Sequence, residues 1–293
     1  MLAIAAMPSI LRDLRMVRKR GKLIRKAPRM LPPLNLESAY NRELQGYCND
    51  LAIVTKQTII PRIEHIVSDF DRLYPRKDGI HLDAFSDKIK EALRSGRESF
   101  GKVYTDQELE KMADRIGRQA SGFNRQQLGR VLQAMIGVDV FMPDHFSEEL
   151  LTGFVHRNVA LIKTIPERYF SQVEELIHRE VSQGVRASVI ANEILGDKLS
   201  TTKFNASRIA RDQVAKANAA FNKYRQVNLG VSGYYWRGML DNRERDEHVN
   251  LEGNYYDWDS GGEPGEGNPG EPVLCRCNAS PALERLMQQL EAA

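Results

Sequence analysis

The sequence predicts a mainly α-helical protein, in which a helical N-terminal body is followed by a small α+β C-terminal domain. Apolar residues recur at three- and four-residue spacing through most of the chain, which is typical of helices that bury one face. Tyr234–Trp236 is predicted to form a strand, and residues 257–272, rich in glycine, proline and acids, a loop. We therefore divide the chain into a basic arm (1–35), a helical body (36–185) and a C-terminal domain (186–293).

A hinge at Pro32-Pro33 precedes the first predicted helices, because proline breaks a helix. The apolar spacing then predicts a helix from Leu36 that Pro61 interrupts. A capping box at Thr105 and Glu108 indicates a later helix start, and Ser121-Gly122 is predicted to break that helix. The predicted helices of this part cover residues 36–54, 63–70, 80–93, 105–116 and 126–136.

Proline and glycine also divide the second half of the chain. Pro166 is predicted to end one helix or to begin the next at its first turn. Gly184, Gly196 and Gly230 are predicted to end three helices, since glycine readily adopts the left-handed conformation found there. The predicted helices of this part cover residues 148–162, 169–181, 189–195, 204–229 and 281–290.

The composition is that of an ordinary soluble protein, with 42 % hydrophobic and 28 % charged residues among 293. No apolar run of about 18 residues occurs, so no membrane-spanning helix is predicted. Residues 1–7 are apolar, but the segment is short and no basic residue precedes it, so no signal peptide is expected. Three cysteines do not form a disulfide framework, which favours a reducing compartment.

A strongly basic segment lies near the N-terminus. Nine bases against one acid, Asp13, give residues 12–29 a net charge of +8. Such a segment favours contact with nucleic acid, because each neutralised phosphate releases a counterion. An acidic protein surface or a merely solvated helix face remain alternatives. The candidate nucleic-acid-binding residues are Arg12, Arg15, Arg18, Lys19, Arg20, Lys22, Arg25, Lys26 and Arg29.

The C-terminal part carries the opposite charge. Residues 241–272 contain ten acids and two bases, a net charge of −8. Bidentate arginine–carboxylate pairs are a natural way to hold such a loop-rich segment, which predicts a structural role for its arginines. The residues expected to pack together in this role are Trp236, Asp241, Arg243, Arg245, His248, Gly253, Cys275, Arg276 and Cys277.

Two other interpretations of these residues stay open. Cys275 and Cys277, expected on one face of a strand, could hold zinc together with His248 and Asp241. Because C-x-C is a weaker zinc pattern than paired C-x-x-C units, we expect no metal and no cofactor. Asp241 and His248 with a cation could instead hydrolyse phosphodiesters. No P-loop, H-E-x-x-H or G-x-S-x-G motif accompanies them, so we expect no enzyme.

In this order, these residues resemble the Mu F-like family of phage head morphogenesis proteins, also called minor capsid or minor head proteins. The resemblance covers about residues 170–280. One departure matters: many members carry a histidine just before the Cys-Arg-Cys segment, whereas Pro272-Val273-Leu274 stands here, which removes one candidate metal ligand. The resemblance runs through Arg208–Gln213, Leu229-Gly230, Tyr235-Trp236, Asp241, Arg243, Arg245, His248, Leu251, Gly253 and Cys275-Arg276-Cys277.

The resemblance implies a virion component or assembly factor rather than an enzyme. Such proteins associate with the portal vertex and act in head assembly and genome delivery. The implied partners are the portal protein, other head proteins and packaged DNA, with no membrane. The implied location is the host cytoplasm during assembly and afterwards the virion head. A free-standing, non-specific DNA-binding protein and a metal-dependent phosphodiesterase remain the alternative functions.

Overall fold

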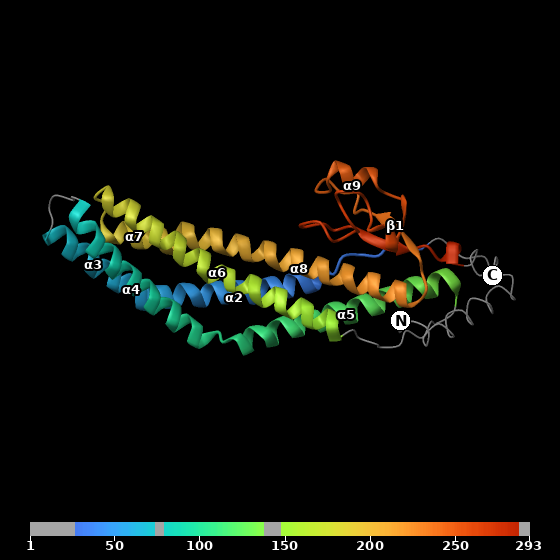
Figure 1. Cartoon of the computed structure of the whole chain (residues 1–293), viewed down its shortest axis with the longest axis horizontal. Coiled ribbons are helices and arrows are strands. Elements are labelled where there is room, and N and C mark those ends of the chain that lie inside the picture. Colours follow the sequence, from blue (N-terminus) through green and yellow to red (C-terminus); the bar gives the residue numbers. More distant parts are fainter. Residues whose placement is uncertain (1–26, 74–78, 138–147, 287–293) are drawn as a thin grey trace. The chain divides into compact units, whose positions relative to one another are not determined.

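The computed structural model describes residues 27–73, 79–137 and 148–286, and within them the fold is mainly α-helical with one small sheet near the C-terminus (Figure 1). The predicted fold class is therefore confirmed. No helix among these residues is long and apolar enough to cross a membrane. The predicted boundaries after residues 35 and 185 stay a prediction.

The chain forms two compact units, each discontinuous in sequence. The helices α2 (Leu34–Val54), α5 (Asp106–Ile136), α6 (Glu148–Ser182) and α8 (Leu199–Asn228) contribute residues to both units. Among the described residues, unit 1 consists of 27–37, 114–137, 148–154 and 211–286, and unit 2 consists of 38–73, 79–113 and 155–210.

Long helices make up most of the described chain. The Thr105 hydroxyl accepts a hydrogen bond from the Glu108 amide (3.4 Å) just before α5, so the predicted helix start is confirmed. Five-residue π-helical turns, η1 (Thr55–Ile59) and η2 (Ile194–Lys198), connect α2 to α3 and α7 to α8. The helices are α2 (Leu34–Val54), α3 (Ile60–Leu73), α4 (Gly79–Val103), α5 (Asp106–Ile136), α6 (Glu148–Ser182), α7 (Ala187–Glu193) and α8 (Leu199–Asn228).

Two predicted breaks in the first half of the chain are wrong. Pro61 lies in the first turn of α3, where its missing N–H costs little, and η1 carries the helical path onward from α2. Ser121 and Gly122 lie inside α5. The Ser121 hydroxyl is buried there and accepts a hydrogen bond from Arg225 Nη2 (2.6 Å). Tertiary contacts therefore outweigh the low helix propensity of this pair.

Two further breaks, at Pro166 and Gly196, are also wrong. Pro166 lies within α6, and the nearby Thr164 hydroxyl donates a hydrogen bond to the Leu161 carbonyl (2.6 Å). Gly196 lies inside η2, and α8 begins three residues later at Leu199. In both places the chain stays helical where the local sequence favours an end, because buried neighbours hold the backbone.

Aromatic side chains and their hydroxyl groups hold unit 2 together. Tyr47 on α2 packs edge-on against Phe100 and Tyr104, with ring centroids 4.9 and 4.5 Å apart. The Tyr104 hydroxyl donates to Asp50 Oδ2 (2.6 Å). The buried Tyr40 hydroxyl donates to Asn158 Oδ1 on α6 (3.1 Å), so the hydroxyl groups of Tyr40 and Tyr104 both have partners within unit 2.

Unit 1 contains the sheet, whose strand order is β2-β1-β3 with both pairs antiparallel. The predicted strand is confirmed as β1 (Gly233–Arg237), the central strand. Helix α9 (Asp246–Asn250) lies between β1 and β2 (Tyr255–Asp257), and η3 (Trp258–Ser260) follows β2. The predicted loop occupies most of the chain from there to β3 (Asn278–Pro281).

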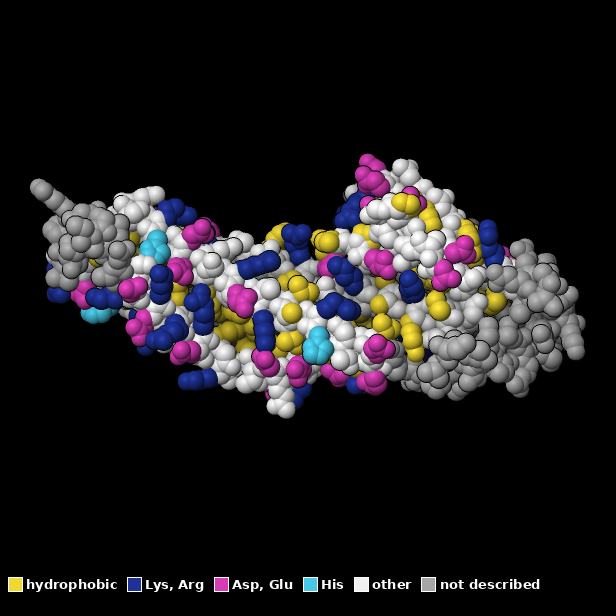
Figure 2. Space-filling view, in the orientation of Figure 1, with side chains coloured by type: hydrophobic (Ala, Val, Ile, Leu, Met, Phe, Trp, Pro, Cys, Tyr) yellow, Lys and Arg dark blue, Asp and Glu magenta, His cyan; other side chains and the backbone are white. Residues whose placement is uncertain are grey.

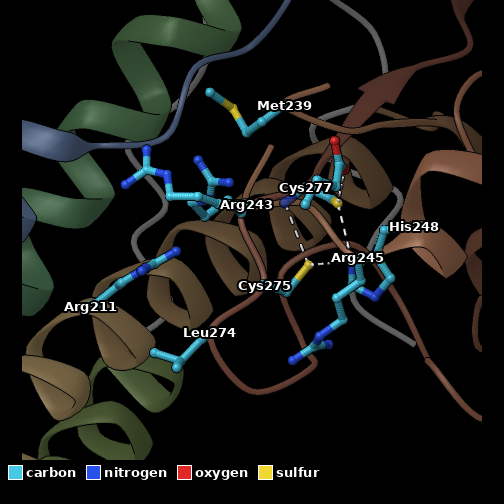
Figure 3. Close-up of a pocket in the computed structure, with 10 residues that line it drawn as sticks. Arg211, Met239, Arg243, Arg245, His248, Leu274, Cys275 and Cys277 are labelled. Carbon is cyan, nitrogen blue, oxygen red and sulfur yellow. Dashed lines mark hydrogen bonds between the residues drawn. The ribbon is translucent and has the colours of Figure 1, made fainter. Parts of the chain in front are cut away.

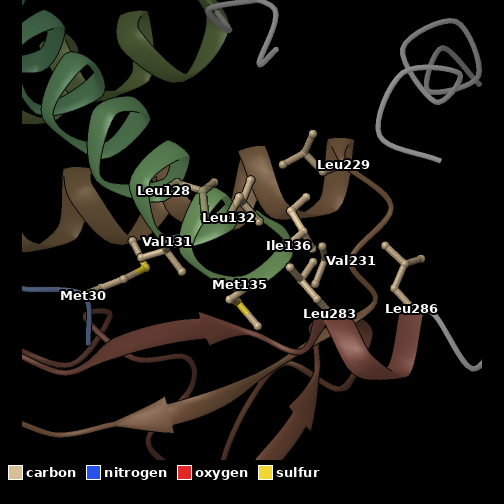
Figure 4. Close-up of a cluster of buried hydrophobic side chains, with 10 residues drawn as sticks. All are labelled: Met30, Leu128, Val131, Leu132, Met135, Ile136, Leu229, Val231, Leu283 and Leu286. Atoms are coloured by element: carbon tan, nitrogen blue, oxygen red, sulfur yellow. The ribbon is translucent and has the colours of Figure 1, made fainter. Parts of the chain in front are cut away.

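An apolar cluster joins segments of unit 1 that are distant in sequence (Figure 4). Its side chains come from the second half of α5, from residues 229 and 231 just after α8, from residue 30 and from the helical residues 283–286. The predicted C-terminal helix thus begins in this cluster, and its later residues lie outside the described part. The members are Met30, Leu128, Val131, Leu132, Met135, Ile136, Leu229, Val231, Leu283 and Leu286.

Buried amide side chains connect α8 to the sheet. Asn222 Nδ2 and Gln226 Nε2 both donate to the Ala279 carbonyl on β3, at 2.8 and 2.9 Å. Asn218 Nδ2 donates to Asn278 Oδ1 (3.3 Å) one residue earlier on the same strand. Because buried amides are costly without partners, these bonds specify how β3 lies along α8.

Basic and acidic side chains are interspersed on the face of the molecule shown in Figure 2. Hydrophobic side chains show between them, partly in small groups, and some exposed apolar area is normal for a protein surface. The described residues of this face therefore carry no broad area of one sign that would by itself indicate a nucleic-acid surface.

Candidate functional site

The sheet positions Trp236 at the centre of a small core. Strand alternation turns Tyr234 and Trp236 to the buried face of β1, and both side chains are fully buried. Trp236 lies edge-on to the His248 ring, with centroids 5.4 Å apart. The core comprises Tyr234, Trp236, Trp258, Cys275, Cys277 and Ala279, with Leu251 and Tyr256 packed against it.

His248, Cys275 and Cys277 meet beside this core and are all buried (Figure 3). His248 Nδ1 lies 3.6 Å from Cys275 Sγ and 3.4 Å from Cys277 Sγ. The expectation that the two cysteines lie on a strand is wrong, because they precede β3 in an irregular segment. Both thiols nevertheless lie close to the same imidazole, because His248 on α9 packs against the end of that segment. We name these three residues the Cys-His cluster.

Polar groups surround the Cys-His cluster on several sides. The other ring nitrogen of the histidine, Nε2, lies 2.8 Å from Glu266 Oε2. The backbone N–H groups of Gly270 and Cys277 each donate to Cys275 Sγ at 3.4 Å. The Cys277 thiol lies 3.2 Å from Glu244 Oε1. These neighbours favour negative charge on Cys275 and fix the orientation of the imidazole ring.

The two thiols shift each other's pKa in opposite directions. A hydrogen bond from Cys277 lowers the pKa of Cys275, and the backbone N–H donors act in the same direction. The same contact with Cys275 raises the pKa of Cys277, and burial raises it further. One thiol of the pair therefore ionises well before the other, as expected for two acids that share a site.

The predicted arginine–carboxylate pairing occurs at Asp241. Arg276 donates from both Nη atoms to the two carboxylate oxygens, a bidentate pair. This contact holds the pKa of Asp241 well below its usual range. Arg243 Nη2 lies farther away, 3.6 Å from the same carboxylate. Arg245 Nη2 donates instead to the Val273 carbonyl (2.6 Å), so it holds a different part of the segment from Arg276 and Arg243.

A cavity of about 270 Å³ adjoins the Cys-His cluster and opens among arginine side chains (Figure 3). Glu244 is the carboxylate in its lining. Its lining residues are Arg211, Met239, Arg243, Glu244, Arg245, His248, Leu274, Cys275, Arg276 and Cys277.

Comparison with known proteins identifies the part of the chain that builds this site. Residues 171–280 match the family model described as phage Mu protein F like protein. This segment is Mu F-like. The resemblance predicted from the sequence is therefore confirmed over nearly the same residues. The family is one of phage head proteins.

A second comparison extends beyond the Mu F-like segment. An uncharacterized protein of Haemophilus influenzae (strain Rd) is 27 % identical over 197 residues, which are 66 % of this chain and 43 % of that protein. The chain thus spans less than half the length of this relative. No solved structure matches the chain.

Within the Mu F-like segment, the structure brings together most of the predicted site residues. Gly253 donates its N–H to the Trp236 carbonyl (2.9 Å) and has a φ of +84°, so it turns the chain back towards β1. Asp241 is not among the residues grouped around His248, because its carboxylate faces Arg276. The structural role predicted for these residues stays a prediction.

Sequence reasoning missed Asp212, Glu244 and Glu266. Asp212 on α8 accepts a hydrogen bond from the Leu274 N–H (2.8 Å) and thereby ties the segment before Cys275 to the helix. Asp212 belongs to the segment Arg208–Gln213 that carries the family resemblance, but only the folded structure shows that it contacts Leu274. Only the three-dimensional structure identifies the two glutamates as neighbours of the Cys-His cluster, because the acidic segment has no periodicity that distinguishes them from its other acids.

Of the nine candidate nucleic-acid-binding residues, Arg29 alone lies in the described part of the chain. Arg29 Nη1 donates to the Gly238 carbonyl (3.2 Å), and Nη2 pairs with Glu252 Oε1 (3.0 Å). Arg29 therefore anchors the end of the arm to the Mu F-like segment. The other eight bases lie outside the described residues, and their contact with DNA stays a prediction.

Proposed function

We propose that the chain is a minor head protein of a phage or prophage, bound at the portal vertex and active in head assembly and genome delivery. The Mu F-like match over residues 171–280 carries this proposal. The long helices of unit 2 offer a portal-docking surface, and the basic arm offers a contact for packaged DNA. Assembly takes place in the host cytoplasm, and the mature protein stays in the head.

The contacts at the Mu F-like site support a structural role over hydrolysis. Both oxygens of Asp241 face Arg276, and both ring nitrogens of His248 have neighbours within the protein. A general base needs a free lone pair within reach of its substrate. We therefore infer that these groups hold the segment together and do not activate water.

Purified heads test the proposal directly. We expect mass spectrometry to find the chain in intact, DNA-filled heads and crosslinking to connect it to the portal protein. Lysines of unit 2, such as Lys88, Lys102 and Lys163, are expected to give more portal crosslinks than Lys216 and Lys223 of unit 1. Absence of the chain from washed heads would contradict the proposal, and crosslinks confined to unit 1 would contradict the assignment to unit 2.

A substitution on the surface of unit 2 is expected to weaken portal binding. The side chain of Phe204 on α8 is 64 % exposed, and aromatic residues are enriched in protein–protein interfaces. Phe204→Glu should reduce co-purification with the portal protein at least several-fold. Val249→Glu, at an exposed apolar residue of unit 1, is the matched control and should leave co-purification unchanged. Equal effects of the two variants would contradict this docking surface.

The basic arm is expected to make DNA binding depend on salt. Replacing the eight bases between Arg12 and Lys26 by glutamine should weaken DNA binding and flatten its salt dependence, by about 0.9 in the log–log slope for each phosphate that the arm no longer neutralises. Arg29→Gln is the matched control, since Arg29 already pairs with Glu252. Titration of a labelled duplex at several salt concentrations measures both. Unchanged affinity at low salt would favour an acidic protein partner for the arm.

A further inference from the structure

We propose that the Cys-His cluster binds a zinc ion, with Glu244 as the fourth ligand. Two cysteine sulfurs and one histidine nitrogen are a common ligand set for zinc, and soft thiolates select it over magnesium or calcium. All three side chains are buried, and their ligand atoms lie within 4.8 Å of one another. The cluster therefore has the composition and the enclosure of a metal site.

The distances between the ligand atoms fit a tetrahedral ion. With Zn–S near 2.3 Å and Zn–N near 2.0 Å, a tetrahedron separates sulfur from nitrogen by about 3.5 Å. The observed separations from His248 Nδ1 are 3.6 Å to Cys275 Sγ and 3.4 Å to Cys277 Sγ. Little movement of these side chains would be needed to accept the ion.

The groups behind the ligands match those that support metal sites. A zinc-bound histidine usually donates its other ring N–H to a carboxylate, and here Nε2 faces Glu266 Oε2 at 2.8 Å. Two backbone N–H groups donate to Cys275 Sγ, which stabilises a thiolate. Besides holding the segment together, both contacts would orient the imidazole and favour a thiolate, as a bound zinc ion requires.

Glu244 lines the cavity beside the Cys-His cluster and contacts Cys277, but its carboxylate does not lie within 4.8 Å of all three ligand atoms, so the side chain would have to move inward to complete the set. Its Oε1 lies 3.2 Å from Cys277 Sγ, and its Oε2 accepts the Leu240 N–H, which holds the carboxylate towards the cavity. The residues just before Cys275 offer no ligand side chain, so the fourth ligand comes from the turn after β1. The ion would then tie the irregular segment before β3 to α9 and to that turn.

Metal analysis of the full chain tests the site. We expect about one zinc per chain after dialysis, and loss of most of it in Cys275→Ser and Cys277→Ser. Cys48→Ser is the matched control, because Cys48 is buried on α2 in unit 2 and should not affect zinc. Zinc retained in both cluster variants, or lost in the control, would overturn the proposal.

The supporting carboxylate gives a graded test. Glu266→Gln is expected to weaken zinc affinity about 10–100-fold, as removal of a second-layer partner typically does. Glu247→Gln, an exposed neighbour of His248 on α9, should leave the affinity unchanged. Competition with a chromogenic chelator measures both affinities, and equal affinities would contradict the role of Glu266.

Cobalt substitution keeps the proposal testable if the cysteine variants fail to fold. The wild-type chain loaded with cobalt should show thiolate-to-metal charge-transfer absorption and the strong visible bands of a tetrahedral ion. A zinc-free chain that takes up no cobalt, and whose tryptophan emission does not respond to chelator, would overturn the proposal. Because this readout needs no phage component, its failure is separate from failure of the head role.

Discussion

Replacing Trp236 with alanine is expected to lower the free energy of unfolding of the Mu F-like sheet region by about 3–5 kcal/mol. Trp236 is fully buried on the central strand and faces His248, Tyr256 and Ala279. A truncated side chain leaves a cavity that neither flanking strand can fill, since both are fixed by backbone pairing to β1. The sheet and the Cys-His cluster should therefore lose stability together.

Intrinsic tryptophan emission measures this effect selectively. The chain has two tryptophans, Trp236 and Trp258, and both lie in the same core. Their emission during denaturant unfolding therefore reports the unfolding of the sheet region, independently of the unfolding of unit 2. In Trp236→Ala the remaining Trp258 serves as the probe.

Two further substitutions separate burial from other effects of Trp236→Ala. Trp236→Phe should lower the free energy of unfolding less than Trp236→Ala does. The indole N–H has no hydrogen-bond partner among the described residues, and phenylalanine keeps most of the side-chain volume. Tyr235→Ala changes the neighbouring residue on the less buried face of β1, and should also cost less. A Tyr235→Ala loss as large as that of Trp236→Ala would contradict the assigned strand alternation.

Local sequence patterns predicted the fold class and the central strand, but they misplaced helix ends. Pro166 and Gly196 carry the residue types that end helices, yet the chain stays helical at both. Low propensity at one position costs about 1–3 kcal/mol, which packing along a long helix outweighs. The strand was easier to predict, because three consecutive aromatic residues occur at one place in the sequence.

The sequence predicted which residue types belong to the candidate site, but it did not predict how they are arranged in space. His248, Cys275 and Cys277 were recognisable as potential ligands by residue type, but 27 residues separate His248 from Cys275. The register of β1 with β3 and the placement of α9 bring them together. Glu244 and Glu266 were indistinguishable from the surrounding acids, since nothing in a loop indicates which carboxylate turns inward.

Replacing Gly270 with alanine is expected to destabilise the same region by about 2–4 kcal/mol, for two separate reasons. Gly270 has a φ of +89°, where an L-residue costs about 1–2 kcal/mol. A Cβ at this position would also lie 2.6 Å from the Cβ of Ala219 on α8, which requires the loop or the helix to shift. Because the Gly270 N–H donates to Cys275 Sγ, a shift of the loop would also disturb the Cys-His cluster.

Gly265→Ala isolates the backbone contribution to this loss. Gly265 has a φ of +86°, and an added Cβ would meet nothing within 4 Å, so its replacement should cost only the backbone strain of about 1–2 kcal/mol. The excess loss in Gly270→Ala then measures the close approach of the loop to α8. Equal losses in the two variants would show that the loop moves away from α8 without cost.

A double-mutant cycle with Ala219 completes the test of this contact. Ala219→Gly alone should cost about 1 kcal/mol, the usual loss for glycine within a helix. Combined with Gly270→Ala, it removes the Cβ that the new methyl group would strike, so the double variant should be more stable than the sum of the single losses predicts. Tryptophan emission during denaturant unfolding measures all four proteins, since Trp236 and Trp258 are present in each. Strict additivity would mean that the loop and α8 do not touch at Gly270, and that the segment carrying Cys275 is held to the helix by the Asp212 hydrogen bond to Leu274 instead.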